Sequence, residues 1–385
     1  MTILSIIGWL CLALAAMGCA YMLAAAATMV RFFAARSPTV RSQTAVTILK
    51  PLHGGEPNLA DNLETFLSQD HDGSIQLLCG LQREDDPAAA AVEELRHRYP
   101  DARINLVIDP TLHGTNGKIA NLINMSAGIA HDLVVLSDSD MAVPHDYLSQ
   151  LLTALDRPGV GVVTCLYRGR GDTGFWSRLC AAGLSYQFLP NATFATAIGQ
   201  IGDACMGSTI ALRRATLEAI GGFAGFADIL ADDHAIGQAV REQGLDIVVP
   251  PMLLTHASDE DSFRALWRHE LRWAATVRAL THPAAYAGTL VTFPLPLAMI
   301  GALVHPASGI ALALVALVTR IVATAMVDIV ASASTASKWL LPARDFLSLA
   351  IFVASYTVRS VDWRGTRLTM EKDGRIAAGT ESQGR

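Results

Sequence analysis

Charged residues are absent from positions 1–30 and scarce between 283 and 358, and this distribution limits what the 385-residue chain can fold into. About 20 consecutive apolar residues suffice to cross a bilayer as a helix. Segments 3–30 and 284–304 have that length, and Pro294 and Pro296 are expected to kink the second one. Segment 308–332 is also long and apolar, and segment 339–358 follows it. We therefore expect a membrane protein with a polar domain between its hydrophobic ends.

The basic residues beside these segments predict which side the polar domain occupies, because loops rich in Lys and Arg stay in the cytoplasm. They are Arg31, Arg36 and Arg41 after the first segment, and Arg359, Arg364 and Arg367 in the tail. Three full spans after a cytoplasmic domain would place the basic tail outside. We therefore expect two true spans there and a third segment that is interfacial or re-entrant.

The predicted division is a transmembrane helix at 1–30, a cytoplasmic domain at 31–282, a membrane region at 283–358 and a cytoplasmic tail at 359–385. Arg320 and Asp328 lie inside a predicted span. Charged residues in such positions serve function, or they pair with neighbours inside the helix bundle. Both interpretations stay open, and pairing is favoured.

Composition excludes some partners. A net charge of −6 argues against nonspecific binding of nucleic acid, which needs a basic surface. The six cysteines show neither a CxxC pair nor the spacing of a zinc site, so scattered buried thiols in a reducing compartment are the expected state.

Short apolar runs alternate with amphipathic stretches through the central domain. The strand candidates are 45–50, 75–81, 104–108, 132–137, 160–166, 208–212 and 246–250. The helix candidates are 58–68, 87–98, 116–129, 145–156, 213–220 and 233–243, the last ending before Gly244. This alternation predicts an α/β sheet with helices on both faces. Ligands of such sheets bind at the carboxyl ends of the strands.

Acidic clusters follow two of these strands. Strand 132–137 runs into Asp138 and Asp140, and strand 75–81 is followed by Glu84, Asp85 and Asp86. In a DxD turn, both carboxylates can hold a divalent cation that shares the oxygens of a diphosphate. The cation would neutralise charge on a departing nucleoside diphosphate. Taken alone, such a turn is also typical of helix capping.

A third acidic pair, Asp232 and Asp233, begins helix 233–243. The helix dipole favours acids at this position whatever their function. A functional carboxylate here would act as the general base that takes a proton from an acceptor hydroxyl. Lys118, flanked by Asn116 and Asn121, begins another helix and is either a phosphate contact or a solvated lysine.

The sequence His269-Glu270-Leu271-Arg272-Trp273 lies on a predicted helix, 262–280, just before the membrane region. Arg272 offers a planar fork to a diphosphate, and Trp273 can form a wall of an acceptor pocket. Arg and Trp at a membrane junction also serve as interfacial anchors. His256 is a candidate metal ligand, although a structural histidine is the favoured interpretation.

Taken together, these segments resemble the ceramide glucosyltransferases, a membrane branch of the glycosyltransferases with the GT-A (nucleotide-diphospho-sugar transferase) fold. The resemblance runs from about Val46 to Arg367. It rests on Lys50-Pro51-Leu52 with Gly54, Pro57-Asn58-Leu59, Asn62 to Phe66, Asp85 to Ala88, Lys118-Ile119 with Asn121-Leu122, Gly221-Gly222-Phe223 and Trp363-Arg364-Gly365.

The resemblance implies a role for each matching position. Asp86, near Asp85, Lys50 and Pro51, would help bind the nucleotide of a UDP-sugar, together with Lys118. Asp138 and Asp140 would hold Mg²⁺ or Mn²⁺ at the diphosphate. Asp233 would be the catalytic base of an inverting transfer, with Asp232, Gly221 and Gly222 beside the acceptor. Arg272 and Trp273 would end the (Q/R)xxRW motif, in which this chain departs from the pattern by having His269 first.

A narrower resemblance bears on the substrate. Cys165 to Arg170, Phe175 to Leu179 and His269 to Trp273 look like the bacterial hopanoid-biosynthesis glycosyltransferases. That group implies transfer of N-acetylglucosamine from its UDP-sugar to a bacteriohopanepolyol, on the cytoplasmic side of the bacterial inner membrane. Transfer of glucose to ceramide is the alternative, because both lipids present a primary hydroxyl at the interface.

Two further alternatives stay open. An enzyme of the same fold could use an anionic polyprenyl phosphate, for which Arg168, Arg170 and Arg178 would supply basic residues at the site entrance. A non-catalytic membrane scaffold or transporter is the other, but a transporter usually has more spans and paired broken helices.

Overall fold

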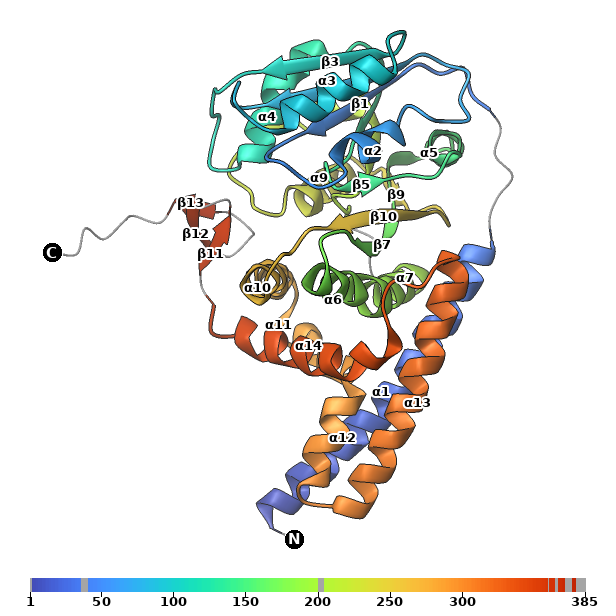
Figure 1. The fold of residues 1–385 in the computed structure, drawn as a ribbon, viewed down its shortest axis with the longest axis vertical. Coiled ribbons are helices and arrows are strands. Elements are labelled where there is room, and N and C mark those ends of the chain that lie inside the picture. The colour runs from blue at the N-terminus through green and yellow to red at the C-terminus, as the bar shows by residue number, and fades with distance from the viewer. Residues whose placement is uncertain are drawn as a thin grey trace, which may run out of the picture.

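The computed structural model describes residues 2–35, 41–199 and 204–358, together with the backbone of three short strands beyond them. Arg36, Arg359 and Arg364, used above to predict sidedness, lie outside the described residues. Figure 1 shows an α/β domain at one end of the molecule and a bundle of long helices at the other, with a layer of shorter helices between them.

A seven-stranded sheet forms the centre of the domain, and all seven predicted strands belong to it. Its order is β3-β2-β1-β4-β8-β6-β9. The strands are β1 (Val46–Pro51), β2 (Ile75–Leu81), β3 (Arg103–Ile108), β4 (Leu133–Leu136), β6 (Val160–Thr164), β8 (Ile210–Arg213) and β9 (Asp246–Val248). Strands β1 to β4 are parallel, whereas β8 runs antiparallel to both β4 and β6. The carboxyl ends of β1 and β4 therefore lie side by side.

Alternate residues of the strands fill two cores, one on each face of the sheet. Ile48 of β1 packs with α2 (Leu59–Glu64), α3 (Ala88–Arg98) and α5 (Tyr147–Leu155). Leu49, the next residue, packs on the opposite face. Helices α4 (Gly117–Met125), α8 (Arg214–Ala219) and α9 (Asp232–Glu242) cover that face, with the 3₁₀ turns η1 (Ser126–Gly128) and η3 (Phe223–Phe226). This confirms the prediction of helices on both faces of an α/β sheet.

A second, three-stranded sheet was not predicted. It consists of β5 (Met141–Ala142), β10 (Leu253–Ser258) and β7 (Leu166–Gly171), in that order. The segment between β7 and β8 also lacked a prediction. It forms α6 (Phe175–Gly183), the π-helical turn η2 (Leu184–Phe188) and α7 (Leu189–Ala197). These helices lie between the sheets and the long helices, as Figure 1 shows.

Two helices, α1 (Ile3–Ala34) and α13 (Pro306–Ala331), are long and apolar enough to cross a membrane. They pack against each other and against α12 (Pro294–Ala302). The predicted kink in segment 284–304 is a sharp break of 77° at Phe293, which separates α12 from α11 (Pro283–Gly288) and η4 (Thr289–Thr292). Counting this bent pair as one span gives up to three candidate spans in the described part of the chain.

The last apolar segment forms η5 (Lys338–Leu340) and α14 (Leu341–Ser355). Figure 1 shows α14 lying across the top of the bundle, under α6 and α10 (Phe263–Leu280), rather than running along α13. Beyond it, β11 (Ser360–Trp363), β12 (Thr366–Met370) and β13 (Ile376–Ala378) form a small antiparallel sheet.

Charged side chains on α13 are paired. Arg320 lies 2.8 Å from Asp345 of α14, and the Tyr186 hydroxyl donates to Asp328 at 2.7 Å. Lys338 is 3.5 Å from the other oxygen of Asp328. The interpretation that Arg320 and Asp328 pair with neighbours is thus confirmed. All six cysteines are free thiols, and all but Cys11 are buried.

Candidate active site

Lys50 braces the turn that carries the DxD residues. Its ammonium group donates to the Asp138 carbonyl at 2.7 Å and to the Ser137 hydroxyl at 3.1 Å. The same group lies 3.5 Å from the centre of the Phe66 ring. Complete burial lowers the pKa of Lys50 to about 7, although nearby carboxylates act in the opposite direction. Lys50, buried beside Pro51 at the end of β1, therefore holds the turn that carries Asp138 in place.

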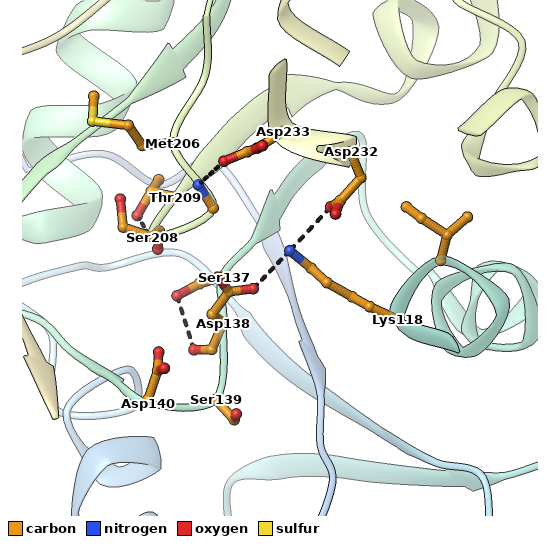
Figure 2. Close-up of polar contacts among 12 residues, drawn as sticks. Lys118, Ser137, Asp138, Ser139, Asp140, Met206, Ser208, Thr209, Asp232 and Asp233 are labelled. Carbon is orange, nitrogen blue, oxygen red and sulfur yellow. Dashed lines mark hydrogen bonds and ion pairs between the residues drawn. The ribbon is translucent and has the colours of Figure 1, made fainter. Parts of the chain in front are cut away.

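Lys118 links two of the three acidic clusters (Figure 2). The Asn116 side chain caps α4 by accepting from the Ile119 N–H at 3.1 Å, which fixes the position of Lys118 in the first turn. The Lys118 ammonium lies 2.7 Å from Asp138 and 3.0 Å from Asp232. Burial opposes the charged form, but the two carboxylates nevertheless raise the pKa of Lys118. A lysine charge is thus held between carboxylates that come from β4 and α9.

Asp233 sits at the start of α9, beside this group. It accepts hydrogen bonds from the backbone N–H of Gly207 at 3.0 Å and from that of His234 at 2.8 Å. Burial and the neighbouring Asp232 raise the pKa of Asp233 to about 6, while Lys118 acts to lower it. A carboxylate whose pKa lies just below neutrality is suited to accept a proton.

Asp140 lies on the opposite side of Asp138 from Lys118, as Figure 2 shows. One of its oxygens lies 3.1 Å from His256 Nε2, and the other is buried without a hydrogen-bond partner among the described residues. Burial would raise the pKa of Asp140, but His256 holds it below its usual value. Carboxylate oxygens are the ligands that hard divalent cations take, so Asp138 and the unpartnered Asp140 oxygen have the right chemistry for such an ion. The two carboxylates do not converge on one point in this arrangement.

Asp86 and Asp85, which were both predicted to bind the nucleotide-sugar donor, lie in different surroundings. Asp86 closes the loop after β1, because one oxygen accepts from the Gly54 N–H at 2.8 Å and from the Ala88 N–H at 3.0 Å. Its second oxygen lies 3.5 Å from His53 Nδ1. Asp85 instead pairs with Arg83 on the surface, where 70% of its side chain is exposed.

The helix α10 brings the HELRW sequence to the Asp140 side of the site. His269 Nδ1 contacts the buried Glu260 carboxylate, and the His269 and Trp273 rings lie 4.3 Å apart. The Trp273 ring is also 5.9 Å from that of His256. Asp140, His256 and His269 border a common hollow, to which Glu56, Asn62 and Asp172 also contribute. Arg272 is half-buried on the same helix.

Gly221 and Gly222 lie in the turn that ends α8, with φ angles of 89° and 65°. The Gly222 N–H donates back to the Leu217 carbonyl at 2.8 Å, which terminates the helix. The turn leads into η3, and the next residue, Ala227, accepts from the Asn116 N–H at 2.9 Å. The backbone contacts of the two glycines therefore end α8, and the Ala227 carbonyl supports the start of α4.

Sequence reasoning missed two residues of the site. Gly207 donates to Asp233 and its carbonyl accepts from the Asp138 N–H at 3.3 Å, so it joins the second and third acidic clusters. Glu260 holds His269. A glycine directly before strand 208–212 and an acid two residues after β10 were the available signals, but neither is specific without the fold.

Comparison with known proteins places the chain in a family. The family model for glycosyl transferase family 21 matches residues 10–376. Ceramide glucosyltransferase 1 of Caenorhabditis elegans is 25% identical over 218 residues, which cover 55% of this chain and 46% of that protein. The ceramide glucosyltransferase of Komagataella phaffii is 32% identical over 116 residues, covering 29% of this chain and 23% of that protein. The chain therefore spans less than half the length of these curated relatives.

A solved structure has a similar fold. The mannosyltransferase PcManGT from Pyrobaculum calidifontis, in complex with GDP-Man and Mn²⁺, superposes with a TM-score of 0.54 and 20% identity. The match covers 92% of this chain and 98% of that one. This likeness shows the α/β GT-A-like fold, which agrees with the prediction. Because the family model extends over nearly the whole chain, from residue 10 to residue 376, the protein belongs to glycosyl transferase family 21.

Proposed function

We propose that the protein is a membrane-bound inverting glycosyltransferase that moves a sugar from a UDP-sugar to the hydroxyl of a membrane lipid. The observation that carries the proposal is the position of Asp233. Its half-buried carboxylate, with a pKa of about 6, lies beside the Lys118, Asp138 and Asp232 group on the family's fold. Hydrogen bonds from Gly207 and His234 hold it in place, as a general base requires.

The donor end of the site is assigned to the carboxyl ends of β1 and β4. The loop that Asp86 closes after β1 would receive the uridine, and Lys118 and Arg272 would contact the diphosphate. A divalent cation held by Asp138 and Asp140, Mg²⁺ or Mn²⁺, would supply charge neutralisation to the leaving diphosphate. The unpartnered Asp140 oxygen supports this assignment, and the mannosyltransferase with a similar fold was solved with Mn²⁺.

Asp233 would take the proton of the acceptor hydroxyl as its oxygen attacks the anomeric carbon in line with the leaving diphosphate. General-base assistance of this kind contributes roughly 10²–10⁴-fold to the rate. The hollow bordered by Asp140, His256 and His269 would receive the head of the lipid. Its position beside α10 supports this assignment, because α10 belongs to the layer of helices between the sheets and the bundle.

The comparisons favour a ceramide-like acceptor and UDP-glucose over the hopanoid and UDP-N-acetylglucosamine expected from the narrower sequence resemblance. The curated relatives that match are ceramide glucosyltransferases. A bacteriohopanepolyol remains the second candidate acceptor, supported only by the sequence segments that resemble the hopanoid-biosynthesis enzymes. Both lipids are therefore included in the test. We further propose that the domain faces the cytoplasm of a bacterial cell, because Arg31 lies in the last turn of α1 and Arg41 follows that helix, on the side of the domain.

The test is an assay of membranes that hold the protein, given UDP-glucose or UDP-N-acetylglucosamine together with ceramide or bacteriohopanetetrol. Lipid products are detected by mass spectrometry, and Asp233→Asn membranes serve as the negative control. A hexosylated ceramide is the expected product. An N-acetylhexosaminyl hopanoid would restore the narrower expectation. If no pairing gives a product although UDP-sugar binds, these two acceptors are excluded and a polyprenyl phosphate becomes the acceptor to test.

A further inference from the structure

The residue after His269 is held by a buried ion pair that reaches to the last apolar helix. Both oxygens of Glu270 contact the guanidinium of Arg344 on α14, and the Nη2–Oε2 distance is 2.6 Å. Only 10% of the Glu270 side chain and 5% of the Arg344 side chain are exposed. Two parallel hydrogen bonds between planar groups fix orientation as well as distance.

Helix α6 contacts the same guanidinium and leaves room for it. The Leu179 carbonyl lies 3.4 Å from Arg344 Nη1. A Cβ atom at Gly183 would lie only 2.7 Å from Arg344 Cζ, so the absence of a side chain there makes room for the charge. Three helices, α6, α10 and α14, therefore meet at one buried arginine.

The adjacent residue, Asp345, extends the connection toward the membrane. It lies 2.8 Å from Arg320 on α13, which also donates to the Tyr186 carbonyl in the π-helical turn. Both side chains are more than nine-tenths buried. Consecutive residues of α14 thus pair in two directions, one toward a candidate membrane span and one toward the helix that carries the HELRW sequence.

Stability alone is a poor explanation for this arrangement. Removing two charges from water costs about as much as their attraction returns, and apolar residues of similar size are often as stable or more so. A bidentate pair does, however, fix both the rotation of α10 about its axis and its position along that axis. Since His269, Arg272 and Trp273 all lie within three residues of Glu270, their positions depend on how α10 is held.

We propose that the Glu270–Arg344 pair is a positioning device for the acceptor side of the active site. It fixes the rotation of α10, so that His269 and Trp273 lie against His256 and thereby beside Asp140. The adjacent Asp345–Arg320 pair connects α14, and through it the rotation of α10, to α13 of the membrane bundle. The role in catalysis rests on the proposed function. Glu270 and Arg344 act through their neighbours and touch no reacting atom.

The test replaces both charges together, as Glu270→Met/Arg344→Met in the full-length protein in detergent. With no buried charge left unpaired, this variant should melt within a few degrees of the unaltered protein. Its kcat should fall roughly 10–100-fold, because misplacing a catalytic group by about 1 Å costs up to that much. The KM for UDP-sugar should change less than kcat, since Arg272 is the one proposed donor contact on α10, whereas Lys118 lies on α4. Amide hydrogen exchange should rise within residues 263–280.

The matched control is Asp156→Met/Arg213→Met, which removes an ion pair of 2.6 Å whose side chains are 58% and 49% exposed. It should leave turnover and the exchange of α10 unchanged. Glu270→Asp is the second variant. It keeps the charge but withdraws the carboxylate by one methylene, so kcat should fall while the melting temperature stays near that of the unaltered protein.

Unaltered kcat and unaltered exchange of α10 in the double methionine variant would overturn the proposal. If that variant fails to fold, unaltered turnover in Glu270→Asp overturns it instead. Faster exchange with full turnover would show a pair that holds the helix without serving catalysis, which also contradicts the proposal. If the unaltered protein makes no lipid product, the proposed function fails separately, while the exchange measurement still decides whether the pair positions α10.

Discussion

At the scale of single residues, Gly207 holds together groups that lie on separate elements. Its N–H donates to Asp233 and its carbonyl accepts from the Asp138 N–H. A Cβ atom at this position would lie 2.6 Å from Asp138 Oδ2, closer than side-chain carbons approach an oxygen. The carboxylate assigned to the metal therefore has its present position only because residue 207 has no side chain.

Gly207→Ala should therefore displace Asp138 and lower kcat/KM by roughly tenfold or more, because placement of the diphosphate depends on that carboxylate. The requirement for Mn²⁺ should rise, measured as the ion concentration that gives half-maximal activity. Gly117→Ala is the control, since a Cβ there lies 3.5 Å from Gln82, an ordinary contact. Equal metal requirements in the two variants would contradict the assignment of Asp138.

Asp233→Asn keeps the shape of the side chain and removes its basicity. We expect kcat to fall roughly 10²–10⁴-fold with little change in the KM for the UDP-sugar. Asp246→Asn at the exposed end of the domain, where Asp246 pairs with Arg241, should retain activity. Near-normal turnover in Asp233→Asn would show that another group takes the proton.

At the scale of secondary-structure elements, the layer between the sheets and the bundle depends on close contacts among α6, α10 and α14. The Ser262 side chain accepts from the Ala265 N–H at 3.2 Å and so begins α10, and buried Leu266 and Ala275 pack along the helix. Arg344 enters this layer against Gly183. Small residues on α6 thus decide whether α14 can dock.

Gly183→Ala should destabilise the protein by about 1–3 kcal/mol, the usual cost of adding a methyl group to a closely packed site. The expected observation is a lower melting temperature in detergent. Gly288→Ala serves as the control, because a Cβ at Gly288 meets nothing within 4 Å. A Gly183→Ala protein that melts like the Gly288→Ala protein would mean that the guanidinium can move aside at little cost.

At the scale of the whole molecule, the helix bundle and the α/β domain lie at opposite ends with the helical layer between them, as Figure 1 shows. Helix α1 packs against α13 although more than 270 residues separate them along the chain. The candidate site is thus on the domain, while α10 and α14 connect it to the bundle. This arrangement suits an enzyme whose acceptor lies in the bilayer.

The predicted sidedness can be tested with Ala219→Cys, which places a thiol on the exposed surface of α8. The native cysteines are buried, apart from the half-buried Cys11 in α1. In spheroplasts, a membrane-impermeant maleimide should label this variant only after the membrane is opened. Labelling of intact spheroplasts would place the domain outside the cell and reverse the predicted topology. The protein without the added cysteine gives the background signal.

The central sheet could be predicted because its strands are short apolar runs bounded by turns, and all seven predicted runs became strands of it. No elements were predicted from residue 167 to 207, nor at β5 and β10. Strands β7 and β10 contain Arg168, Arg170 and His256 among their residues, so they lack an apolar run. Helix α7 lacks the amphipathic period that identifies a surface helix, whereas α6 has one that sequence reasoning overlooked.

For the site, the sequence by itself determined the acidic clusters and their order. It placed two of them after strands and the third at the start of a helix, because local patterns set strands, helices and turns. Only the tertiary structure decided which carboxylates meet. It joined Lys118 to Asp138 and Asp232, turned Asp140 toward His256, and left Asp85 on the surface. It also paired Glu270 with Arg344 across 74 residues. Such contacts depend on how separate elements pack, and packing distances are not written in the spacing of residues along a chain.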